Sequence, residues 1–395
     1  MIEPVGLVPG PGMPPALWQR FCAVCAVVEA NRAEIARARE LPAAVAGAYL
    51  EADLYRILVP TDLGGAGLGP LEHLDMAERM AFHDASAGWN LAVGPALGYF
   101  SGFMPPEQAR AMFTREGAAM AGSGAPQGVA VAVDGGYQVS GRFGWASGID
   151  QAQWVYGGCF VYGADGTPEL LADGRPRSIM AFAPKSAAMI HPCWEVSGLV
   201  ATNSTEFTLD KVFVPEDRIV RSELAQVWHD SALFRVPMTI FGFALTGVPL
   251  GVARRAVEGL RALALSKDVP VRGRLCDNPF AQYALAKAEA MIEAARGNLR
   301  ASFAVLWAAA EAGETAPMAA RARVRRAVVH AAEASTEAVS LCYRAAGGSA
   351  LFVSGPFEAA LRDVNAMGGH LVFQRAMMED AGRVALGQAP TLAVF

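Results

Sequence analysis

The chain has 395 residues, a formal net charge of −5 and a sequence pI of about 5.8. This length allows two or three structural units around sizeable cores, and the scattered basic residues argue against a nucleic-acid-binding surface. The hydrophobic fraction of 53% predicts a large core and subunit interfaces. No stretch reaches roughly 18 consecutive strongly apolar residues, and no signal-peptide pattern opens the chain. We therefore expect no membrane association and a cytoplasmic protein.

The six cysteines are too scattered to predict a disulfide framework. Cys22 and Cys25 form a C-x-x-C pair, but they lie in an apolar helical stretch without a second Cys/His pair nearby. The histidines other than His370 show no metal-ligand spacing. The sequence therefore predicts no metal site.

Residues 14–120 are expected to be helical. Apolar residues recur every three or four positions over 17–36 and 41–58, and a further helix is predicted at about 71–81. A segment with one proline and several glycines separates the second of these helices from the third. These patterns predict an N-terminal helical domain over 1–119.

The pattern changes at about residue 120. Short β-branched runs alternate with turn signals such as Asp134-Gly135-Gly136, which is typical of a small β-barrel or sandwich. A strand over 205–214 should end at Val214-Pro215, because proline cannot continue the pairing. We therefore predict a middle β-domain over 120–222.

Residues 223–395 are predicted to form a C-terminal helical domain. Its long segments rich in Ala, Leu, Arg and Glu are 240–265, 279–312, 316–346 and 356–385. The order of helices, strands and helices is not that of a doubly wound α/β fold, and no G-x-G-x-x-G follows a strand. A nicotinamide cofactor bound to a Rossmann unit is therefore not expected.

The most informative segment is the predicted strand 136–148, which alternates apolar and polar residues and ends in Trp145-Ala146-Ser147-Gly148. An indole at this place can lie against a flat cofactor. The Ser147 hydroxyl and nearby backbone N–H groups can reach the cofactor's edge, where Gly148 allows close approach. An ordinary sheet edge with a buried tryptophan is the alternative.

Several short signatures occur in an order that resembles the acyl-CoA dehydrogenase superfamily over nearly the whole chain. They are Leu58-Val59-Pro60 with Gly64-Gly65, Asp84-Ala85-Ser86-Ala87-Gly88-Trp89, Trp145-Ala146-Ser147-Gly148, Gly198-Leu199 with Thr202-Asn203-Ser204, Val212-Phe213-Val214-Pro215, and Ala345-Ala346-Gly347-Gly348 with Leu361-Arg362-Asp363. The resemblance implies an α+β fold with an N-terminal helical domain, a middle β-barrel and a C-terminal four-helix bundle. It also implies a homotetramer built on that bundle.

The chain departs from the dehydrogenases of this superfamily at the catalytic base. Those enzymes need a carboxylate to remove a proton next to a thioester carbonyl. The two regions where the family carries that acid, 240–256 and 364–374, contain none, but the second contains His370. In this respect the chain resembles the superfamily's two-component flavin-dependent monooxygenases. These receive reduced flavin (FAD or FMN) from a separate NAD(P)H:flavin reductase and use O₂ through a flavin C4a-hydroperoxide.

The resemblance also implies roles for individual residues. His370 and Ser147 would be catalytic, with the Ser147 hydroxyl bonded to flavin N5 and the neutral imidazole bonding oxygen or accepting a substrate proton. The implied flavin-binding residues are Ser123, Trp145, Ser147, Arg272, Arg274, Gly347 and Gly348. The two arginines would contact the flavin phosphate, and the two glycines lie in the element that contacts a neighbouring subunit's flavin.

The candidate substrate-binding residues are Trp89, Asn90 and Phe241, with Phe243 as a further candidate, although aromatic residues at helical spacing more often belong to a core. The segment 91–100 lacks the further polar residue of many relatives, which favours a hydrophobic aromatic or indole-like substrate. The expected reaction is hydroxylation of an aromatic or heteroaromatic small molecule.

Three alternatives remain open from the sequence. The chain could be an acyl-CoA dehydrogenase or oxidase-type flavoenzyme that uses another base. It could be a catalytically silent scaffold of the same fold. His370 could be a helix histidine bonded to a backbone carbonyl. The sequence does not distinguish FMN from FAD, nor C-, N- and S-oxygenation.

Overall fold

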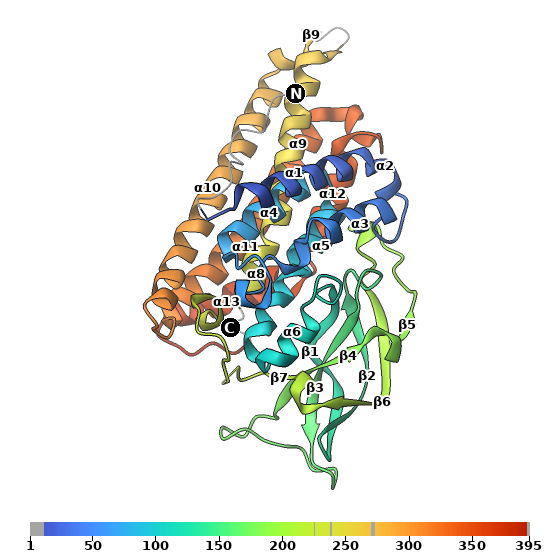
Figure 1. Cartoon of the computed structure of the whole chain (residues 1–395). Coiled ribbons are helices and arrows are strands. Elements are labelled where there is room, and N and C mark those ends of the chain that lie inside the picture. The colour runs from blue at the N-terminus through green and yellow to red at the C-terminus, as the bar shows by residue number, and fades with distance from the viewer. Residues whose placement is uncertain (1–11, 225, 238, 270–272, 393–395) are drawn as a thin grey trace.

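The computed structural model describes residues 12–224, 226–237, 239–269 and 273–392. Figure 1 shows the N-terminal helices packed along a bundle of long C-terminal helices, with the sheet at the lower end of both. The order of helices, sheet and helices is the order expected from the sequence. No helix in the described part of the chain has the length and apolar character needed to cross a bilayer.

The N-terminal region consists of short helices. They are α1 (Pro15–Ala30), α2 (Arg32–Ile35), α3 (Ala43–Glu51), α4 (Pro70–His83), α5 (Ala85–Val93) and α6 (Pro106–Met112), with 3₁₀ segments η1 (Leu54–Arg56), η2 (Thr61–Leu63) and η3 (Pro95–Phe103). The expected helix over 17–36 is split, because the Asn31 side chain donates to the Val27 carbonyl at 2.7 Å and ends α1. Helix α4 packs along the bundle, and α5 follows it towards the sheet.

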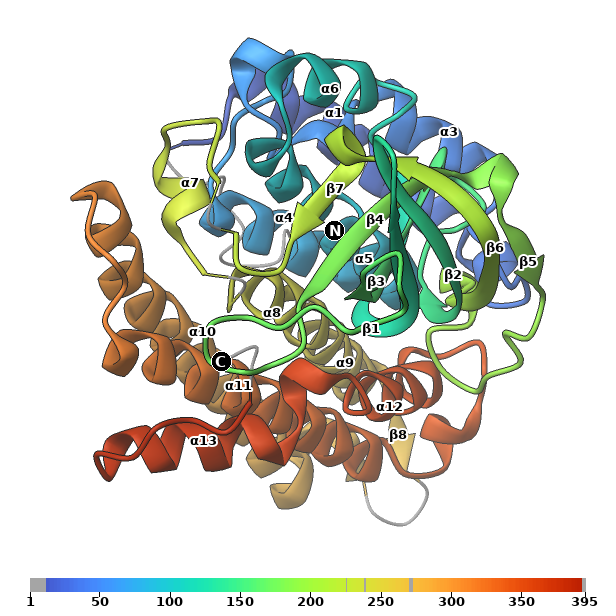
Figure 2. The ribbon, with the colours of Figure 1, turned by 90° about the horizontal axis from the view of Figure 1, so that it is seen from below.

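The middle region forms a seven-stranded sheet in the order β5-β6-β2-β1-β3-β4-β7. Its strands are β1 (Met120–Val133), β2 (Gly136–Ala146), β3 (Trp154–Tyr162), β4 (Ser178–Pro184), β5 (Met189–His191), β6 (Thr205–Pro215) and β7 (Ile219–Arg221). Only the β1–β3 pair is parallel. Figure 2 shows that the sheet curls strongly. Inside it, the rings of Phe143 and Phe207 stack with centroids 5.1 Å apart.

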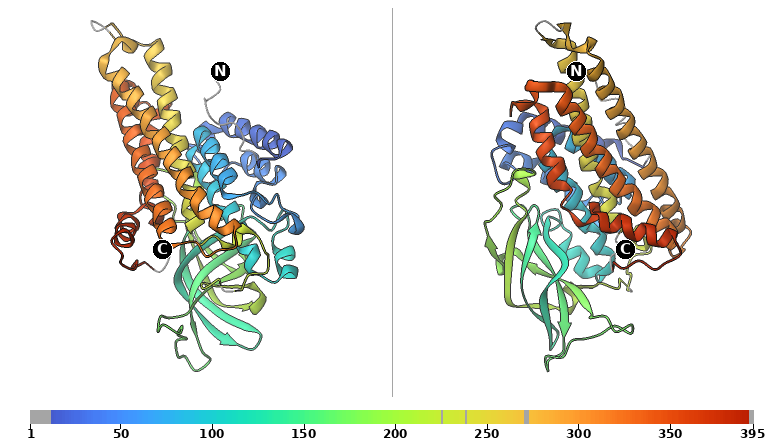
Figure 3. Two further views of the ribbon diagram at one scale, coloured as in Figure 1. Left: turned by 90° about the vertical axis from the view of Figure 1, so that its left-hand side faces the viewer. Right: turned by 180° about the vertical axis from the view of Figure 1, so that it is seen from behind.

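The C-terminal region is helical apart from a two-stranded turn. It contains α7 (Ala232–Arg235), α8 (Thr239–Leu245), α9 (Gly247–Ser266), β8 (Asp268–Val269), β9 (Gly273–Arg274), α10 (Pro279–Glu311), α11 (Met318–Ala346), α12 (Pro356–Met367) and α13 (Arg375–Ala385). Figure 3 shows α9, α10 and α11 running side by side. The ring of Phe243 stacks on that of Phe303 at 4.0 Å, so Phe243 belongs to the core between these helices.

The helix expected over 356–385 is two helices. Helix α12 ends at Met367, α13 begins at Arg375, and a 3₁₀ turn, η9 (Leu371–Phe373), lies between them. The break coincides with Gly368-Gly369 and with an extended backbone at His370. His370 is therefore not a helix residue, and this interruption is what turns its ring towards α5.

Candidate active site

The indole of Trp89 lies at the centre of the candidate site. Helix α5 begins at Ala85, where the Asp84 carboxylate accepts a hydrogen bond from the Ala87 N–H at 3.0 Å. Four residues further on, Trp89 is buried, and its Nε1–H donates to the Ser147 hydroxyl at 3.1 Å. Its ring meets the His370 ring edge-on, with centroids 5.5 Å apart. Trp89 therefore brings together two residues that lie far apart in the sequence.

Ser147 follows directly after strand β2, in a turn with an unusual backbone. Trp145 has φ 64° and Gly148 has φ 74°, and a left-handed backbone is rare for a bulky aromatic residue. The Trp145 side chain is 69% exposed, so a large apolar face lies open beside the Ser147 turn. A Cβ at Gly148 would lie 2.7 Å from Asn90 Oδ1, so glycine lets the turn approach α5. An exposed indole beside a buried hydroxyl fits a flat, polar-edged ring such as a flavin.

A chain of hydroxyl groups continues from Ser147 into the protein. Its Oγ lies 2.6 Å from Ser204 Oγ, which lies 2.8 Å from Thr202 Oγ1. Thr202 in turn donates to the Leu199 carbonyl at 3.0 Å. Thr202 ends the 3₁₀ turn η5 (Val200–Thr202), and Ser204 precedes β6. The Ser147 hydroxyl is therefore held from two sides, by the indole and by this chain.

Helix α12 fixes the segment that carries these hydroxyls. The Asp363 carboxylate accepts a hydrogen bond from the Leu199 N–H at 2.7 Å, and Arg362 donates to the Ser197 carbonyl. A Cβ at Gly198 would lie 2.5 Å from the Arg362 carbonyl oxygen, so only glycine permits this contact. Burial raises the pKa of Asp363 to about 7. The Arg-Asp pair thus attaches the bundle to the β-domain beside Ser147.

His370 lies at the start of η9 with a defined hydrogen-bond role. Its Nδ1 accepts from the Val372 N–H at 3.4 Å, which leaves the ring proton of the neutral form on Nε2. Burial lowers the pKa of His370 to about 4, so the imidazole is neutral at physiological pH. It packs between the rings of Trp89 and Phe373. The neutral ring can present a hydrogen-bond donor at Nε2.

The buried carboxylates Asp75, Glu78 and Asp380 and the half-buried Asp84 and Asp363 all have other partners, so none of them is a free base at this site. Asp75 and Glu78 pair with arginines of α9 and α10, Asp84 caps α5, and Asp363 binds the Leu199 N–H. Asp380 accepts hydrogen bonds from Thr391 and from the Leu392 N–H. None of these five carboxylates is therefore available to act as a base beside His370.

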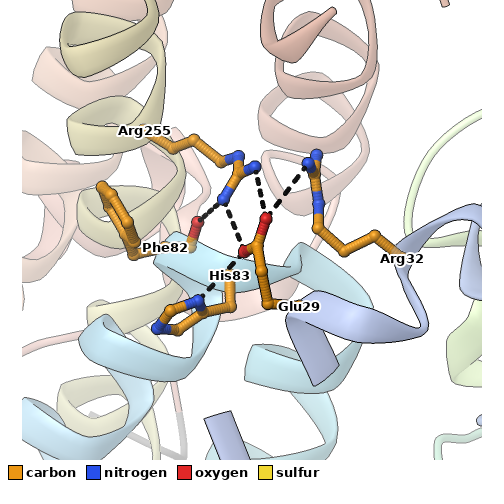
Figure 4. Close-up of polar contacts among 5 residues, drawn as sticks. All are labelled: Glu29, Arg32, Phe82, His83 and Arg255. Atoms are coloured by element: carbon orange, nitrogen blue, oxygen red, sulfur yellow. Dashed lines mark hydrogen bonds and ion pairs between the residues drawn. The ribbon is translucent and has the colours of Figure 1, made fainter. Parts of the chain in front are cut away.

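The start of α5 is held by an ion-pair cluster shown in Figure 4. The Glu29 carboxylate of α1 accepts from Arg255 of α9 at 3.0 and 3.1 Å and contacts His83 Nδ1 at 3.0 Å. Burial opposes its charge, but the hydrogen bonds from His83 and Arg255 outweigh burial and lower the pKa of Glu29 to about 2. Arg255 also donates to the Phe82 carbonyl. The cluster therefore fixes the end of α4, next to the residue that caps α5.

Phe241 of α8 belongs to an aromatic group near the sheet. Its ring stacks on Phe100 with centroids 5.5 Å apart and meets Tyr99 edge-on at 5.6 Å. Both partners come from η3, the segment that follows α5. Asn90 lies beside Trp89 and donates to the Ser86 carbonyl. The predicted substrate residues thus lie on two helices, α5 and α8.

The other predicted flavin residues lie on β1, on the β8–β9 hairpin and at η8 (Gly347–Leu351). Ser123 is half-buried on β1, where it pairs with Gly157 of β3. Arg274 is exposed on β9, at the end of the bundle opposite the sheet (Figure 1). The exposed Gly347 and Gly348 begin η8. The Lys267 ammonium, next to β8, donates to Ser349 at 2.7 Å, which ties η8 to the hairpin that carries Arg274. Arg272 lies outside the described residues.

The roles of Ser204, Thr202 and Asp363 were missed from the sequence. All three stand in motifs quoted for the family resemblance, but the hydroxyl residues are more than fifty positions from Ser147. The sequence signal that could have indicated them is the run of polar residues, Thr202 to Ser204, directly before the predicted strand at 205–214. Among the described residues, no group of His, Cys, Asp and Glu could hold a metal ion.

Comparisons with known proteins place this geometry in a family. Residues 19–115 match the acyl-CoA dehydrogenase N-terminal domain, and residues 243–375 match the acyl-CoA dehydrogenase C-terminal domain. Together these matches cover more than half of the chain. The chain belongs to the acyl-CoA dehydrogenase superfamily, and the predicted fold class is confirmed.

Relatives within that superfamily include monooxygenases. The chain is 28% identical over 365 residues to indole-3-acetate monooxygenase of Pseudomonas putida, covering 91% of each chain. It is 29% identical over 396 residues to the FADH(2)-dependent resorcinol hydroxylase, oxygenase component, of a Rhizobium species, covering 94% of this chain and 92% of the relative. The predicted similarity to the flavin-dependent monooxygenases is therefore confirmed.

A solved structure agrees with this fold. The structure of XiaF from Streptomyces sp. in complex with FADH2 and glycerol superposes with a TM-score of 0.88 at 22% identity, covering 96% of this chain and 97% of that chain. At this identity the superposition supports the fold.

Proposed function

We propose that this protein is the oxygenase component of a two-component flavin-dependent monooxygenase, and that it hydroxylates an aromatic or heteroaromatic small molecule. It is an oxidoreductase that uses reduced flavin and O₂. The observation that carries the proposal is the position of Trp89, whose indole contacts both Ser147 and His370. Each of the three predicted domains, 1–119, 120–222 and 223–395, contributes one of these three residues to the site.

The reduced flavin, when bound, supplies the electrons with which O₂ is activated. Ser147 would hold the ring edge, Trp145 would cover one face, and Ser123 would add a second hydroxyl. The exposed indole and the half-buried serine on neighbouring parts of the sheet are consistent with these roles. Whether the flavin is FAD or FMN depends on the phosphate end, where Arg274 and Arg272 would act.

His370 would act as a neutral imidazole. Because Nδ1 accepts from the Val372 N–H, the proton on Nε2 is the one that can be donated. This favours a role in which His370 donates a hydrogen bond to the oxygen that is transferred, ahead of a role as a base. With a pKa of about 4, the ring would keep this state down to mildly acidic pH.

The substrate would lie against Trp89, Asn90 and Phe241. The aromatic rings around Phe241 and the apolar segment after α5 suit a flat hydrophobic molecule of phenol or indole type. Two relatives are named for indole-3-acetate and resorcinol, which are both aromatic. These compounds and free indole are therefore the first substrates to test.

A separate NAD(P)H:flavin reductase would supply the reduced flavin in the cytoplasm. We also propose a homotetramer, because β9, which carries Arg274, lies at the end of the bundle away from the sheet (Figure 1), and Lys267 ties η8, which begins with Gly347 and Gly348, to this hairpin. Large apolar side chains are exposed beside these glycines, namely Leu351, Phe352 and Val353. A neighbouring copy of the chain would cover these side chains, and Arg274 would contact the phosphate of the flavin bound to that copy.

The decisive experiment combines the purified protein with NADH, FAD or FMN, and a flavin reductase under air. We expect hydroxylated product from at least one of indole, indole-3-acetate and resorcinol only when the reductase is present. Rapid NADH oxidation by the protein alone would contradict the two-component assignment. Reduction of the bound flavin by an acyl-CoA would favour the dehydrogenase alternative, and failure to bind either flavin would favour the scaffold.

A further inference from the structure

The hydroxyl chain behind Ser147 has fixed ends. At one end stands the Leu199 carbonyl, which can only accept a hydrogen bond. At the other end stands the Trp89 indole N–H, which can only donate one. Between them lie the hydroxyls of Thr202, Ser204 and Ser147, each of which has one proton to donate. The direction of every bond in the chain can therefore be worked out.

The direction follows from the carbonyl end. Thr202 gives its proton to the Leu199 carbonyl, so the 2.8 Å contact with Ser204 requires Ser204 to donate. The Ser204 proton is then used, so the 2.6 Å contact with Ser147 requires Ser147 to donate. All three residues are buried, with exposures of 1%, 6% and 9% from Thr202 to Ser147. Solvent therefore offers little alternative to these partners.

The backbone around the chain holds the Leu199 carbonyl in place. Leu199 and Asn203 have φ of 53° and 38°, and both are non-glycine residues in the left-handed region. The Asp363 carboxylate holds the Leu199 N–H, and Asp150 accepts from the Asn203 side chain at 2.7 Å. The carbonyl that sets the direction is thus held by contacts on both sides of the turn.

The Ser147 oxygen is consequently left with one specific capacity. Its proton is committed to Ser204, and one of its lone pairs accepts from Trp89. Its remaining lone pair can accept a hydrogen bond from a ligand, but the hydroxyl has no proton left to donate. Ser147 can therefore accept a hydrogen bond from a ligand N–H. A ring nitrogen without a hydrogen is itself an acceptor, so it forms no hydrogen bond with Ser147.

We propose that Ser204 and Thr202 are positioning residues that make Ser147 an obligatory acceptor, so that the site binds reduced flavin in preference to oxidised flavin. The proposal rests on the proposed function, in which Ser147 faces flavin N5. That nitrogen carries a hydrogen in reduced flavin and is a bare acceptor in oxidised flavin. Reduced flavin gains a hydrogen bond at Ser147, and oxidised flavin brings two acceptors together.

Two variants release the Ser147 proton in different ways. Ser204→Ala removes the acceptor, so Ser147 can turn and donate to oxidised flavin. Thr202→Val keeps the shape of Thr202 but frees the Ser204 proton, so Ser204 can donate to Ser147 and the chain can reverse. Ser204→Thr keeps the hydroxyl and should behave like the parent. Ser335→Ala is the matched control, because this buried serine donates to the Ala331 carbonyl inside α11.

The test compares dissociation constants of FAD and of dithionite-reduced FAD, measured by anaerobic fluorescence titration of the complete protein and repeated with FMN. We expect the parent to prefer reduced flavin. Ser204→Ala and Thr202→Val should each lower this preference by about tenfold, the usual effect of one buried hydrogen bond. The midpoint potential of the bound flavin should then fall by about 30 mV, the equivalent of a tenfold change for a two-electron couple. Ser204→Thr and Ser335→Ala should leave both values unchanged.

The outcomes separate this inference from the proposed function. If the parent prefers reduced flavin and Thr202→Val folds but leaves the preference unchanged, the directed chain is wrong and the oxygenase assignment stands. An equal affinity of the parent for both redox states overturns the inference as well. If the parent binds neither FAD nor FMN in either state, the proposed function itself fails. Circular dichroism and melting temperature of each variant identify any loss of affinity that comes from unfolding.

Discussion

The residues predicted to bind flavin fall into two regions that are built differently. Around Ser147, the β-domain, α5 and the segment after α12 meet, and hydrogen bonds link residues more than fifty positions apart in the sequence. Around Arg274, a short hairpin and η8 are joined through Lys267 at the opposite end of the bundle (Figure 1). We propose that one chain completes the first region and that the second region serves the flavin of a neighbouring copy. The proposed oligomer follows from this difference.

The largest effect is expected from replacing His370, because it belongs to the region around Ser147 that one chain completes. We expect His370→Ala to lower hydroxylation by about 10²–10⁴-fold, the usual effect of a positioned acid or base. Flavin affinity should change much less. Single-turnover product yield with reduced flavin and O₂, together with melting temperature, measures both effects on one sample.

His73 provides the matched control for that variant. It is fully buried, its Nε2 contacts the Leu91 carbonyl at 2.8 Å, and burial lowers its pKa to about 4 as well. His73→Gln should therefore lower stability without changing turnover per folded molecule. If His370→Ala behaves in the same way, His370 is a packing residue.

The pH profile tests the same residue without a mutation. The pKa of free histidine lies near 6.5, but burial lowers that of His370 to about 4. The folded site therefore keeps a neutral ring as pH falls from 7 to 5. We expect single-turnover hydroxylation to stay level over this range. An acid limb with a midpoint near 6.5 that disappears in His370→Ala would contradict the neutral ring.

Ser147→Ala should have the next largest effect. Its hydroxyl is the only predicted contact with the flavin ring edge that is also held by two protein groups, Trp89 and Ser204. Losing such a hydrogen bond typically costs about 1–3 kcal/mol, or roughly 5- to 150-fold in a rate. We expect more hydrogen peroxide per product in the coupled assay with reductase and NADH. A yield and peroxide leak equal to the parent's would show that Ser147 is only a strand-end residue.

Arg274 tests the second region. Arg274→Ala should raise the dissociation constant of reduced FAD by about tenfold, as expected for a lost charge-assisted hydrogen bond. Arg175→Ala is the control, because this exposed arginine on a β-domain loop pairs with Asp173 and has no predicted ligand. Equal affinity in the Arg274 variant, the Arg175 variant and the parent would remove Arg274 from the flavin site.

Mixed oligomers sharpen this test. Co-expressed His370→Ala and Arg274→Ala chains would form some sites with the intact His370 of one chain and the intact Arg274 of its neighbour. At limiting flavin, such oligomers should exceed the summed activity of the two variants purified separately. If both residues served the same chain's flavin, no site in the mixture would be intact and no gain would appear.

The sequence predicted the order of domains well because hydrophobic period changes sharply near residue 120 and again after 222. The prediction was wrong where the apolar pattern continues across a break in the helix. The sequence predicted one helix over 356–385, but the structure has two, separated at Gly368-Gly369. The candidate residues Ser147 and His370 came from motifs, but the chain through Ser204 and Thr202 did not. Its hydrogen bonds depend on how the end of β2 packs against the turn before β6. Such long-range packing produces no periodic pattern of residues in the sequence.

The last prediction concerns the stability of the fold and not its activity, through Asp363, which joins the bundle to the β-domain. Burial raises its pKa to about 7 from the usual 3.8, with Asp84 and Glu358 adding to the rise and Arg362 opposing it. Between about pH 4 and pH 7 the unfolded chain therefore releases a proton that the folded protein keeps, and stability falls as pH rises. Asp363→Asn can still accept from the Leu199 N–H but cannot titrate. The parent should lose about 2–3 kcal/mol more unfolding free energy than this variant between pH 5 and pH 8.

Chemical denaturation at the two pH values measures this difference, and Asp380 supplies a control of opposite sign. Burial acts to raise the pKa of Asp380, but hydrogen bonds from the Thr391 and Leu392 N–H groups outweigh it and lower that pKa. Stability from Asp380 is therefore present above its usual pKa and is lost as pH falls. At pH 8, Asp380→Asn should have a lower free energy of unfolding than the parent. Between pH 5 and pH 8, Asp363→Asn should instead become more stable relative to the parent. Equal losses in the parent and in Asp363→Asn between pH 5 and pH 8 would mean that Asp363 is already ionised in the folded protein, and that the attachment of α12 to Leu199 is an ordinary charged contact.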